Sequence, residues 1–526
     1  MTTPVLPPRR WWALGALVLS VLVVGLDGTI VNVALPTLAG ELGADSGQLL
    51  WIGGGYLLAF SVAMLPVGRI GDRRGHRRLL LAGLALFGLA SLAGAFVDSP
   101  GAVIAVRAVL GLGAALIMPI SMALLPRIFP AGELSRALAV WTAAAALGMP
   151  AGPVIGGWLL DHFWWGSVFL FNVPVVALAL LAAGLLLPAD PTPADRAADR
   201  PAAELAAPAA PFDLRGTVLS TVGITALVHG AILVPTEGWG DPVVLLTLGA
   251  GAVLLAVFVR QQRRTPGALV DLRLFADRGF AWGTLTAVFG NFTIMGILFL
   301  VPQYLESVQG FDAFGTGLRV LPLIGGLMLS AAAGEALLPR LGARTVVPAG
   351  LLVLAAGVLL GADAGPGTGY GYTALWLSVV GVGFGLAIVP STGLVLATLP
   401  KDDAGAGTSV LETLQQVGGV LGVAGLGSIL GAGYLARIDT SGLPAPAAAA
   451  ARDSIAAADA LARQLPDPAL LSSAHNAFVH GMSTVLTVCG AIAVLAAALA
   501  ALFLPSRPKP DRAAAVEPEH PAEALI

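Results

Sequence analysis

Long apolar stretches follow one another along most of the chain, separated by short polar or Gly- and Pro-containing segments. A run of about 20 apolar residues is the length that an α-helix needs to cross the hydrocarbon core of a bilayer. The hydrophobic pattern therefore predicts fourteen membrane-spanning helices. Their predicted ranges are 12–35, 49–67, 79–97, 101–125, 137–160, 167–187, 214–235, 243–259, 280–304, 317–338, 345–362, 373–397, 408–431 and 477–504.

Breaks in this pattern group the spans as six, two and six. The segment 188–213 is rich in Pro, Ala and charge, which is typical of a solvated linker. We therefore predict a six-helix bundle over 1–187, two inserted helices with a cytoplasmic loop over 214–279, and a second six-helix bundle over 280–504. A cytoplasmic tail is predicted over 505–526.

Within the second bundle, the outer loop 432–476 is unusually long and rich in Ala. Its spacing of Ala, Arg and Asp is compatible with a short helical cap over the outer mouth of the bundle. A solvated loop without such a cap is the alternative.

The composition agrees with a polytopic membrane protein, because 57% of the residues are hydrophobic and 11% charged, with a mean hydropathy of +0.86. Cys489 is the single cysteine, so there is neither a disulfide framework nor a cysteine metal site. Neither Lys401 nor Lys509 follows a Gly, which excludes a P-loop. The charges are spread over short loops and indicate no nucleic-acid partner. We expect an all-α integral membrane protein that is not an enzyme and has no metal, nucleotide or prosthetic group.

Basic residues lie mostly on one side of the predicted membrane. If both termini share a side, the opposite side carries Arg319, Arg437, Arg452 and Arg463, and Arg107 alone falls inside a span. Cytoplasmic loops of membrane proteins carry the excess of Lys and Arg. The bias therefore predicts an even number of spans with both termini in the cytoplasm.

The strongest basic segment is 68–78, GRIGDRRGHRR, which we predict to be a short cytoplasmic loop outside the lipid. Part of it recurs in the second bundle. Arg73, Gly75 and Arg77 correspond to Arg340, Gly342 and Arg344 at one constant offset. This recurrence favours two six-helix halves that are related as parallel repeats.

An ionisable side chain inside a span is costly and is a functional candidate by default. Asp27 lies about eight residues, or roughly 12 Å, from the outer end of the first span, and Arg107 lies about six residues, or roughly 9 Å, from the outer end of the fourth. Because the two are at similar depth, we predict that they interact. The contact can couple a proton to a conformational change, or it can be a purely structural ion pair.

Several of these segments resemble motifs of the major facilitator superfamily. Residues Gly68, Asp72, Arg73, Gly75 and Arg77 are similar to the conformational gating loop between spans 2 and 3 of that superfamily. LDGTIVNVALP at 26–36 resembles the first-span signature of its fourteen-span drug:proton antiporters, and AVRAVLGLGAA at 105–115 resembles their fourth-span motif. The resemblance implies that Arg107 takes part in proton transfer, and the similar depth of Asp27 makes it the partner that we propose for proton coupling.

The fifth span contains GMPAGPVIGG at 148–157, which resembles the antiporter motif of the same superfamily. The matching residues are Gly148, Pro150, Gly152, Pro153, Gly156 and Gly157. Three of these glycines recur every four residues and form a smooth stripe, while the two prolines favour a bend. The motif implies efflux, and we expect the stripe to seal the two halves against proton leak.

The chain departs from the family pattern at two acids in its second half. Glu306 stands where Gln is usual, and in the thirteenth span Glu412 and Gln415 stand where Asn and Arg are usual. We expect both acids to bias the substrate cavity toward cations, although either can instead be a second protonation site. Aromatic residues proposed for the same cavity are Trp141, Phe289, Phe292 and Tyr304.

The resemblance implies a major facilitator fold and a proton-coupled exporter of amphipathic, cationic drugs or antibiotics, driven by the proton motive force. Two alternatives remain: a narrow exporter of a natural product made by the same cell, and a proton-coupled symporter such as a peptide transporter. We expect a monomer in a bacterial inner (plasma) membrane, with protons, lipid and a small molecule as its partners.

Overall fold

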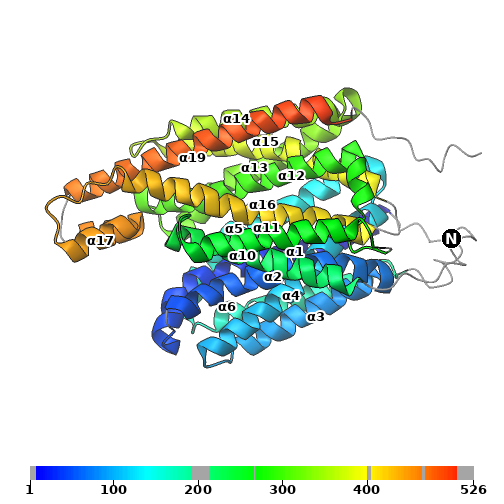
Figure 1. The fold of residues 1–526 in the computed structure, drawn as a ribbon, viewed down its shortest axis with the longest axis horizontal. Helices are drawn as coiled ribbons and strands as arrows, with labels where there is room; N and C mark the ends of the chain where they lie inside the picture. Colours follow the sequence, from blue (N-terminus) through cyan, green and yellow to red (C-terminus); the bar gives the residue numbers. More distant parts are fainter. Residues whose placement is uncertain are drawn as a thin grey trace, which may run out of the picture.

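The computed structural model describes residues 7–44, 46–190, 213–265, 267–399, 404–464 and 468–505. Over these residues the chain is helical and contains no strand (Figure 1). Thirteen of the helices are long and apolar enough to cross a membrane, and a shorter apolar stretch, Phe314–Ser330, lies within a further long helix. The prediction of an all-α membrane protein with fourteen long helices is confirmed.

The first half of the molecule is a bundle of six long helices, the last of which is broken after its first turn. Its helices are α1 (Pro7–Leu42), α2 (Ser46–Arg74), α3 (His76–Gly94), α4 (Pro100–Ile128), α5 (Ala131–His162), α6 (Ser167–Leu170) and α7 (Asn172–Leu186). In this half α1 packs against α5, α2 against α4, and α3 against both α4 and α7.

The second half repeats this arrangement. Its helices are α12 (Arg278–Gln303), the short η2 (Tyr304–Val308), α13 (Ala313–Leu341), α14 (Ala343–Ala362), α15 (Tyr370–Thr398), α16 (Ala404–Leu435) and α19 (Pro468–Phe503). Here α12 packs against α16, α13 against α15, and α14 against both α15 and α19. The two halves meet where α2 contacts α16 and where α5 contacts α13.

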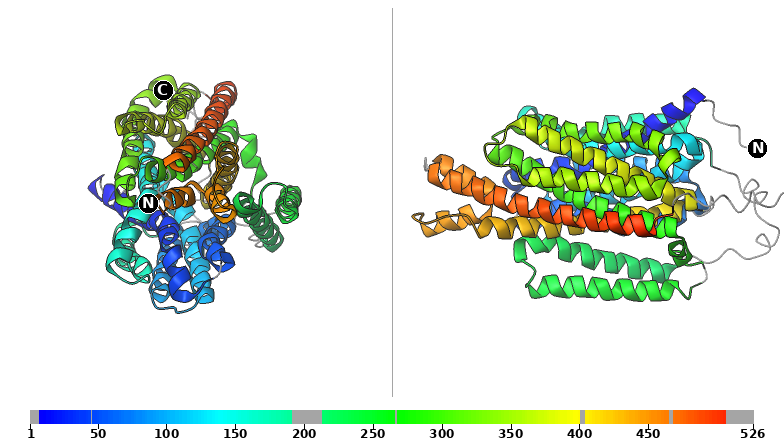
Figure 2. Two further views of the ribbon diagram at one scale, coloured as in Figure 1. Left: turned by 90° about the vertical axis from the view of Figure 1, so that its left-hand side faces the viewer. Right: turned by 90° about the horizontal axis from the view of Figure 1, so that it is seen from above.

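Two inserted helices, α10 (Leu214–Glu237) and α11 (Pro242–Gln262), lie side by side along one side of the bundle, as Figure 2 shows in green. A short 3₁₀-helix, η1 (Leu272–Ala276), follows them. α10 contacts α2 of the first half and α16 of the second. The predicted linker 188–213 lies outside the described residues except at its ends, as does most of the tail 505–526.

Several helices run past the predicted span ends. α19 has 36 residues and begins at Pro468, whereas the span was predicted to begin at 477. At 1.5 Å per residue a helix of that length is about 54 Å long, well beyond the roughly 30 Å of a hydrocarbon core. Hydropathy marks the part of a helix that lipid can surround, and it does not mark where the helix ends.

The segment 68–78 is also more helical than predicted. It was expected to be a loop, but α2 continues to Arg74 and α3 begins at His76, so that Gly75 alone separates them. Gly75 has a φ of 103°, a region that side chains with a Cβ disfavour. One glycine is therefore enough to reverse the chain. We call the end of the bundle that carries 68–78 the basic end, and the opposite one the far end.

The Ala-rich segment 432–476 is largely helical at the far end. It contains α17 (Ala445–Asp453) and α18 (Ile455–Gln464), and Figure 1 shows α17 projecting beyond the bundle. The Tyr434 hydroxyl donates to the Ala451 carbonyl at 2.9 Å. α18 also contacts η2 and α19. Of the two alternatives for this segment, the helical one is correct.

Candidate functional site

A buried ion pair joins α1 to α4 inside the first half. Arg107 Nη1 lies 2.7 Å from Asp27 Oδ2, and neither residue is exposed to solvent. Arg107 also donates from Nη1 to the Asp27 carbonyl at 3.2 Å and from Nε to the Ile52 carbonyl on α2 at 3.1 Å. The predicted contact is present, because the equal depth of the two residues brings them together. Their role in proton coupling stays a prediction.

Two further helices complete the surroundings of this pair. Asn172 Nδ2, in the first turn of α7, donates to Asp27 Oδ1 at 2.8 Å and to Ser91 Oγ of α3 at 3.0 Å. Ser91 in turn donates to the Phe169 carbonyl at 3.0 Å. Both Asn172 and Ser91 are fully buried. The sequence analysis missed this contact, although a lone Asn between apolar residues was a visible signal.

Tyr56 of α2 packs against both Arg107 and α1. Its ring centroid is 4.4 Å from the Arg107 guanidinium carbon, and its hydroxyl donates to the Val24 carbonyl at 3.1 Å. A Cβ on Gly28 would lie 3.6 Å from the same ring. The Tyr56 side chain thus connects Arg107 to the backbone of α1.

At the basic end, Asp72 of α2 binds the first turn of α16. Its Oδ1 accepts from the Gly405 amide and its Oδ2 from the Ala406 amide, each at 2.8 Å. A carboxylate is stabilised at a helix N-terminus by the free amides and the helix dipole. A Cβ on Gly68 would clash with the Gly405 carbonyl and with Ser409, so the glycine permits this close approach. Asp72 therefore links the two halves.

The arginines of the two repeats have equivalent partners. Arg77 donates from Nη2 to the Gly184 carbonyl in the last turn of α7. Arg344 donates from Nε to the Ala501 carbonyl, near the end of α19, at 2.8 Å. Gly342 has a φ of 75°, also positive like that of Gly75. The weak sequence repeat therefore corresponds to a structural repeat. Arg73, the first arginine of the repeated pattern, lies exposed at the basic end.

The glycine stripe of α5 faces α1, within the same half. A Cβ on Gly148 would lie 2.8 Å from the Gly25 Cα, one on Gly152 2.8 Å from the Leu26 carbonyl oxygen, and one on Gly156 2.8 Å from Ile30 Cγ1. The expectation that the stripe seals the two halves against each other is therefore wrong for these glycines. A smooth helix face predicts close packing but does not say which helix supplies the partner. A Cβ on Gly157 would meet no neighbour within 4 Å, and Pro153 faces a cavity instead.

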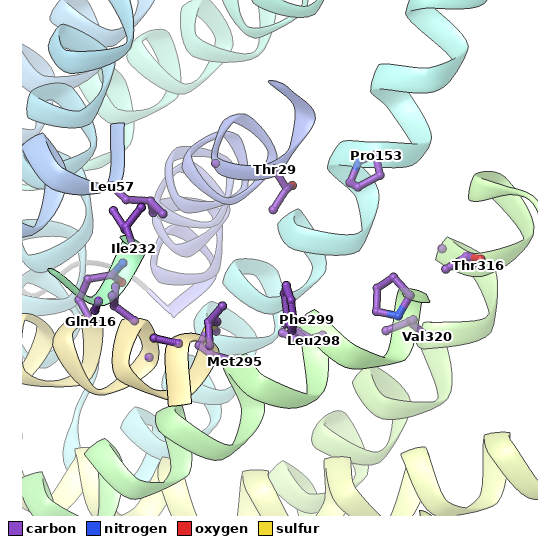
Figure 3. Close-up of a pocket in the computed structure, with 18 of the residues that line it drawn as sticks. Thr29, Leu57, Pro153, Ile232, Met295, Leu298, Phe299, Thr316, Val320 and Gln416 are labelled. Carbon is purple, nitrogen blue, oxygen red and sulfur yellow. The ribbon is translucent and has the colours of Figure 1, made fainter. Parts of the chain in front are cut away.

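This cavity has a volume of about 470 Å³ and lies between the halves. Its lining runs from Gln416, near the middle of α16, to Thr316, in the first turn of α13 at the far end. Figure 3 shows Thr29 and Pro153 on one side and Phe299 opposite them. Most lining residues are apolar, and Glu306 is the ionisable residue among those described.

Most of the residues predicted to line the cavity do not line it. Glu306 lines it, as predicted. Trp141 donates instead to Ser121 Oγ of α4 at 3.1 Å, and the Tyr304 hydroxyl donates to the Gly365 carbonyl at 3.0 Å. Phe289 and Phe292 are half-buried away from the lining. Membrane helices are apolar on every face, so a rule based on residue type cannot tell which face meets the cavity.

Glu412 was predicted near the inner mouth of the cavity and is not part of its lining. Its side chain is 7% exposed, in a stretch of α16 that is buried throughout. The predicted role of Glu412 in the cavity is wrong for this conformation.

Asp213 anchors the inserted helices at the basic end. It accepts from the Gly216 amide at 2.8 Å, from Gln262 Nε2 at 2.6 Å and from Gln261 Nε2 at 3.0 Å. Burial alone would raise the pKa of this carboxyl, but the hydrogen bonds outweigh burial and hold the pKa below its ordinary value. Gln262 Oε1 also accepts from the Val270 amide at 3.0 Å, which ties the helix pair to the loop before α12.

Comparisons with known proteins agree with this architecture. The family model described as Major Facilitator Superfamily matches residues 17–423. A tetracenomycin C resistance and export protein from Streptomyces glaucescens is 34% identical over 525 residues, which covers 98% of this chain and 95% of that protein. The methyl viologen resistance protein SmvA from Salmonella typhimurium is 34% identical over 494 residues, which covers 93% of this chain and 97% of that protein. The solved proton:xylose symporter XylE shares the fold, with a TM-score of 0.59 and 14% identity over 95% of this chain and 96% of that one.

Proposed function

This chain belongs to the Major Facilitator Superfamily, and on that premise we propose that it is an efflux transporter that exports amphipathic drugs or antibiotics in exchange for protons. The observation that carries the proposal is the match over nearly its whole length to two proteins named for drug resistance. An apolar cavity between the halves, with few polar groups, supports it because such cavities suit amphipathic molecules.

A closing contact at the basic end and a cavity that reaches the far end support alternating access. At the basic end Asp72 holds α2 against α16, while the cavity is lined as far as the first turn of α13 at the far end. Releasing Asp72 from the amides of Gly405 and Ala406 separates α2 from α16 and admits cargo from the basic end. Reforming these bonds closes that route and leaves the far end as the exit.

The proton acts through α1. Protonation of Asp27 removes the charge that attracts Arg107 and that accepts from Asn172, so α1 loosens from α4 and α7. The next residues of α1, Gly28 and Thr29, line the cavity. Proton binding at Asp27 therefore changes the cavity wall by moving α1. The proton and the cargo do not compete for the same carboxylate. No prosthetic group is required, because the proton gradient supplies the energy.

The cavity favours cationic cargo through Glu306, at its far-end rim. Glu306→Gln should weaken export of a cation such as ethidium about twofold to fivefold, the range expected for a solvent-exposed charge, and leave a neutral antibiotic unaffected. Glu237→Gln is the matched control, because Glu237 is an exposed acid at the far end of the bundle, where α10 ends. Equal effects of both changes on both compounds would remove Glu306 from the cation site.

A second candidate function is narrow export of one natural product, which the relative named for tetracenomycin C favours. The membrane and orientation belong to the same proposal. We propose a bacterial plasma membrane with both termini in the cytoplasm, because the positive-inside rule places the basic end there. We also propose that the chain is a monomer. A panel of cations and neutral antibiotics separates broad from narrow export.

The test is proton release from everted membrane vesicles, followed with a pH-sensitive dye. Addition of ethidium or methyl viologen should move protons out of vesicles that contain the chain. Asp27→Asn should abolish this release while binding of the cation to purified protein persists. Asp98→Asn, an exposed carboxyl in the turn after α3, is the matched control and should behave as the natural chain does. Proton release that survives Asp27→Asn would overturn the coupling mechanism.

A further inference from the structure

The inserted helix α10 forms part of the cavity wall. Among the residues that line the cavity, Ala231 and Ile232 come from α10, and the others come from helices of the two halves. Figure 2 shows that α10 and α11 lie at the edge of the bundle. The insert nevertheless reaches the cavity, because α10 contacts both α2 and α16.

The backbone of α10 near the cavity is fixed on two sides. Ala231 and Val234 form an apolar cluster with Ala424 of α16 and Val244 of α11. At its other end, Asp213 and the two Gln side chains of α11 hold the beginning of the helix. A substitution at the cavity surface of α10 therefore changes the cavity more than it changes the position of the helix.

Ile232 lies between the cavity and a second, much smaller void. It lines the cavity of about 470 Å³ and also a void of about 10 Å³. Its Cδ1 lies 3.4 Å from the place that a Cβ on Gly54 of α2 would occupy. The small void is also lined by Trp51 and His229, whose rings stack with centroids 5.7 Å apart. The branched side chain of Ile232 thus closes the cavity off from an aromatic pair.

We propose that Ile232 is a specificity-determining residue, whose side chain limits the size of the flat aromatic cargo that the cavity accepts. The inference rests on the proposed function. A shorter side chain joins the void to the cavity and gives cargo in the cavity access to the Trp51 ring, on whose face aromatic cations bind. A longer one narrows the cavity at the same place. The insert is then a third wall of the binding site, in addition to the two halves.

The experiment uses the purified full chain in proteoliposomes with an imposed pH gradient. Ethidium serves as the large flat probe and methyl viologen as the small one, and the half-saturating concentration of each is measured by substrate-driven proton movement. Ile232→Ala should lower the value for ethidium roughly tenfold and Ile232→Trp should raise it by a similar factor, since a few carbon atoms in an apolar pocket have effects of this size. The value for methyl viologen should change less than about twofold.

Leu246→Ala and Leu246→Trp are the matched controls, because Leu246 of α11 is 72% exposed on the outer face of the insert. They should leave both probes unchanged. The ratio of the two half-saturating concentrations cancels differences in reconstitution, and thermal unfolding of each variant checks the fold. An unchanged ratio in both Ile232 variants overturns the inference alone. A natural chain that moves neither probe overturns the proposed drug export and the inference with it.

Discussion

The two halves of the molecule share one helix arrangement and differ in their charges. α1 and α4 of the first half carry Asp27 and Arg107, buried and paired. α12 and α15 take the same places in the second half, where the charged residue in their sequences is Arg278, at the first position of α12. The two halves therefore share their helix packing, whereas the buried Asp27–Arg107 pair belongs to the first half.

The basic ends of the two halves differ in the same way. Arg77 and Arg344 bind the last turns of α7 and α19 in both repeats. Asp72, however, has Pro339 at the matching position of the second repeat, and the Pro side chain has no acceptor that can bind helix amides. The contact from an acid to a helix N-terminus across the halves thus comes from the first half.

The largest expected effect is the loss of one partner of the buried pair. Arg107→Met leaves the Asp27 carboxylate buried without its cation, which should lower the free energy of unfolding by about 3–5 kcal/mol. Denaturant unfolding in detergent measures it. The double variant Asp27→Asn with Arg107→Met removes both charges and should recover most of the loss. A single variant as stable as the natural chain contradicts the importance of the pair.

The next prediction compares one side-chain amide from each half, the buried Asn172 and the half-buried Asn291. Asn172 donates to the carboxylate of Asp27, whereas Asn291 of α12 donates to the neutral Gln415 carbonyl at 2.6 Å. Asn172→Leu should therefore cost about 1.5–3 kcal/mol and Asn291→Leu about 0.5–1.5 kcal/mol of unfolding free energy. The pH profile of proton exchange should change in the first variant and not in the second. Identical pH profiles would assign Asn172 a structural role alone.

The third prediction concerns the link at the basic end. Asp72→Asn weakens the interaction with the α16 N-terminus by about 1 kcal/mol and should shift the population toward opening of the basic end roughly fivefold. A cysteine at the buried position Ser409, in a Cys489→Ser background, reports this opening through its rate of maleimide labelling. Pro339→Ala, at the matching position, should leave the labelling rate unchanged. Equal rates in both variants would show that Asp72 does not hold this end closed.

The smallest expected effect is on the anchor of the insert. Because the folded-state pKa of Asp213 is lowered, its stabilisation is present above the pKa of an unfolded-chain Asp, about 3.9, and is lost as the pH falls through the folded value. Asp213→Asn retains a helix cap but loses the charge. Thermal unfolding should then depend less on pH below about pH 4 than in the natural chain. Parallel pH dependence of the two proteins would contradict this role.

Some of the site followed from residue order alone. Asp27 and Arg107 are rare charges in apolar spans, so their depth along two helices was enough to predict the contact. Glu306 lies at a helix end next to the cavity rim, and its charge set it apart. Asn172 and the partner of the glycine stripe did not follow, because both depend on how α1, α5 and α7 are rotated about their axes.

The sequence by itself determined the spans, the basic end, the repeat and the depth of each charge, since apolar length and the placement of Arg are properties of the chain order. The tertiary structure alone decided which helix faces meet. Spans that are apolar all round give no signal for rotation, so the packing of neighbouring backbones selects the facing residues. Because of that packing, Trp141, Tyr304 and Glu412 lie outside the cavity lining. Ile232 of an inserted helix is part of the cavity wall.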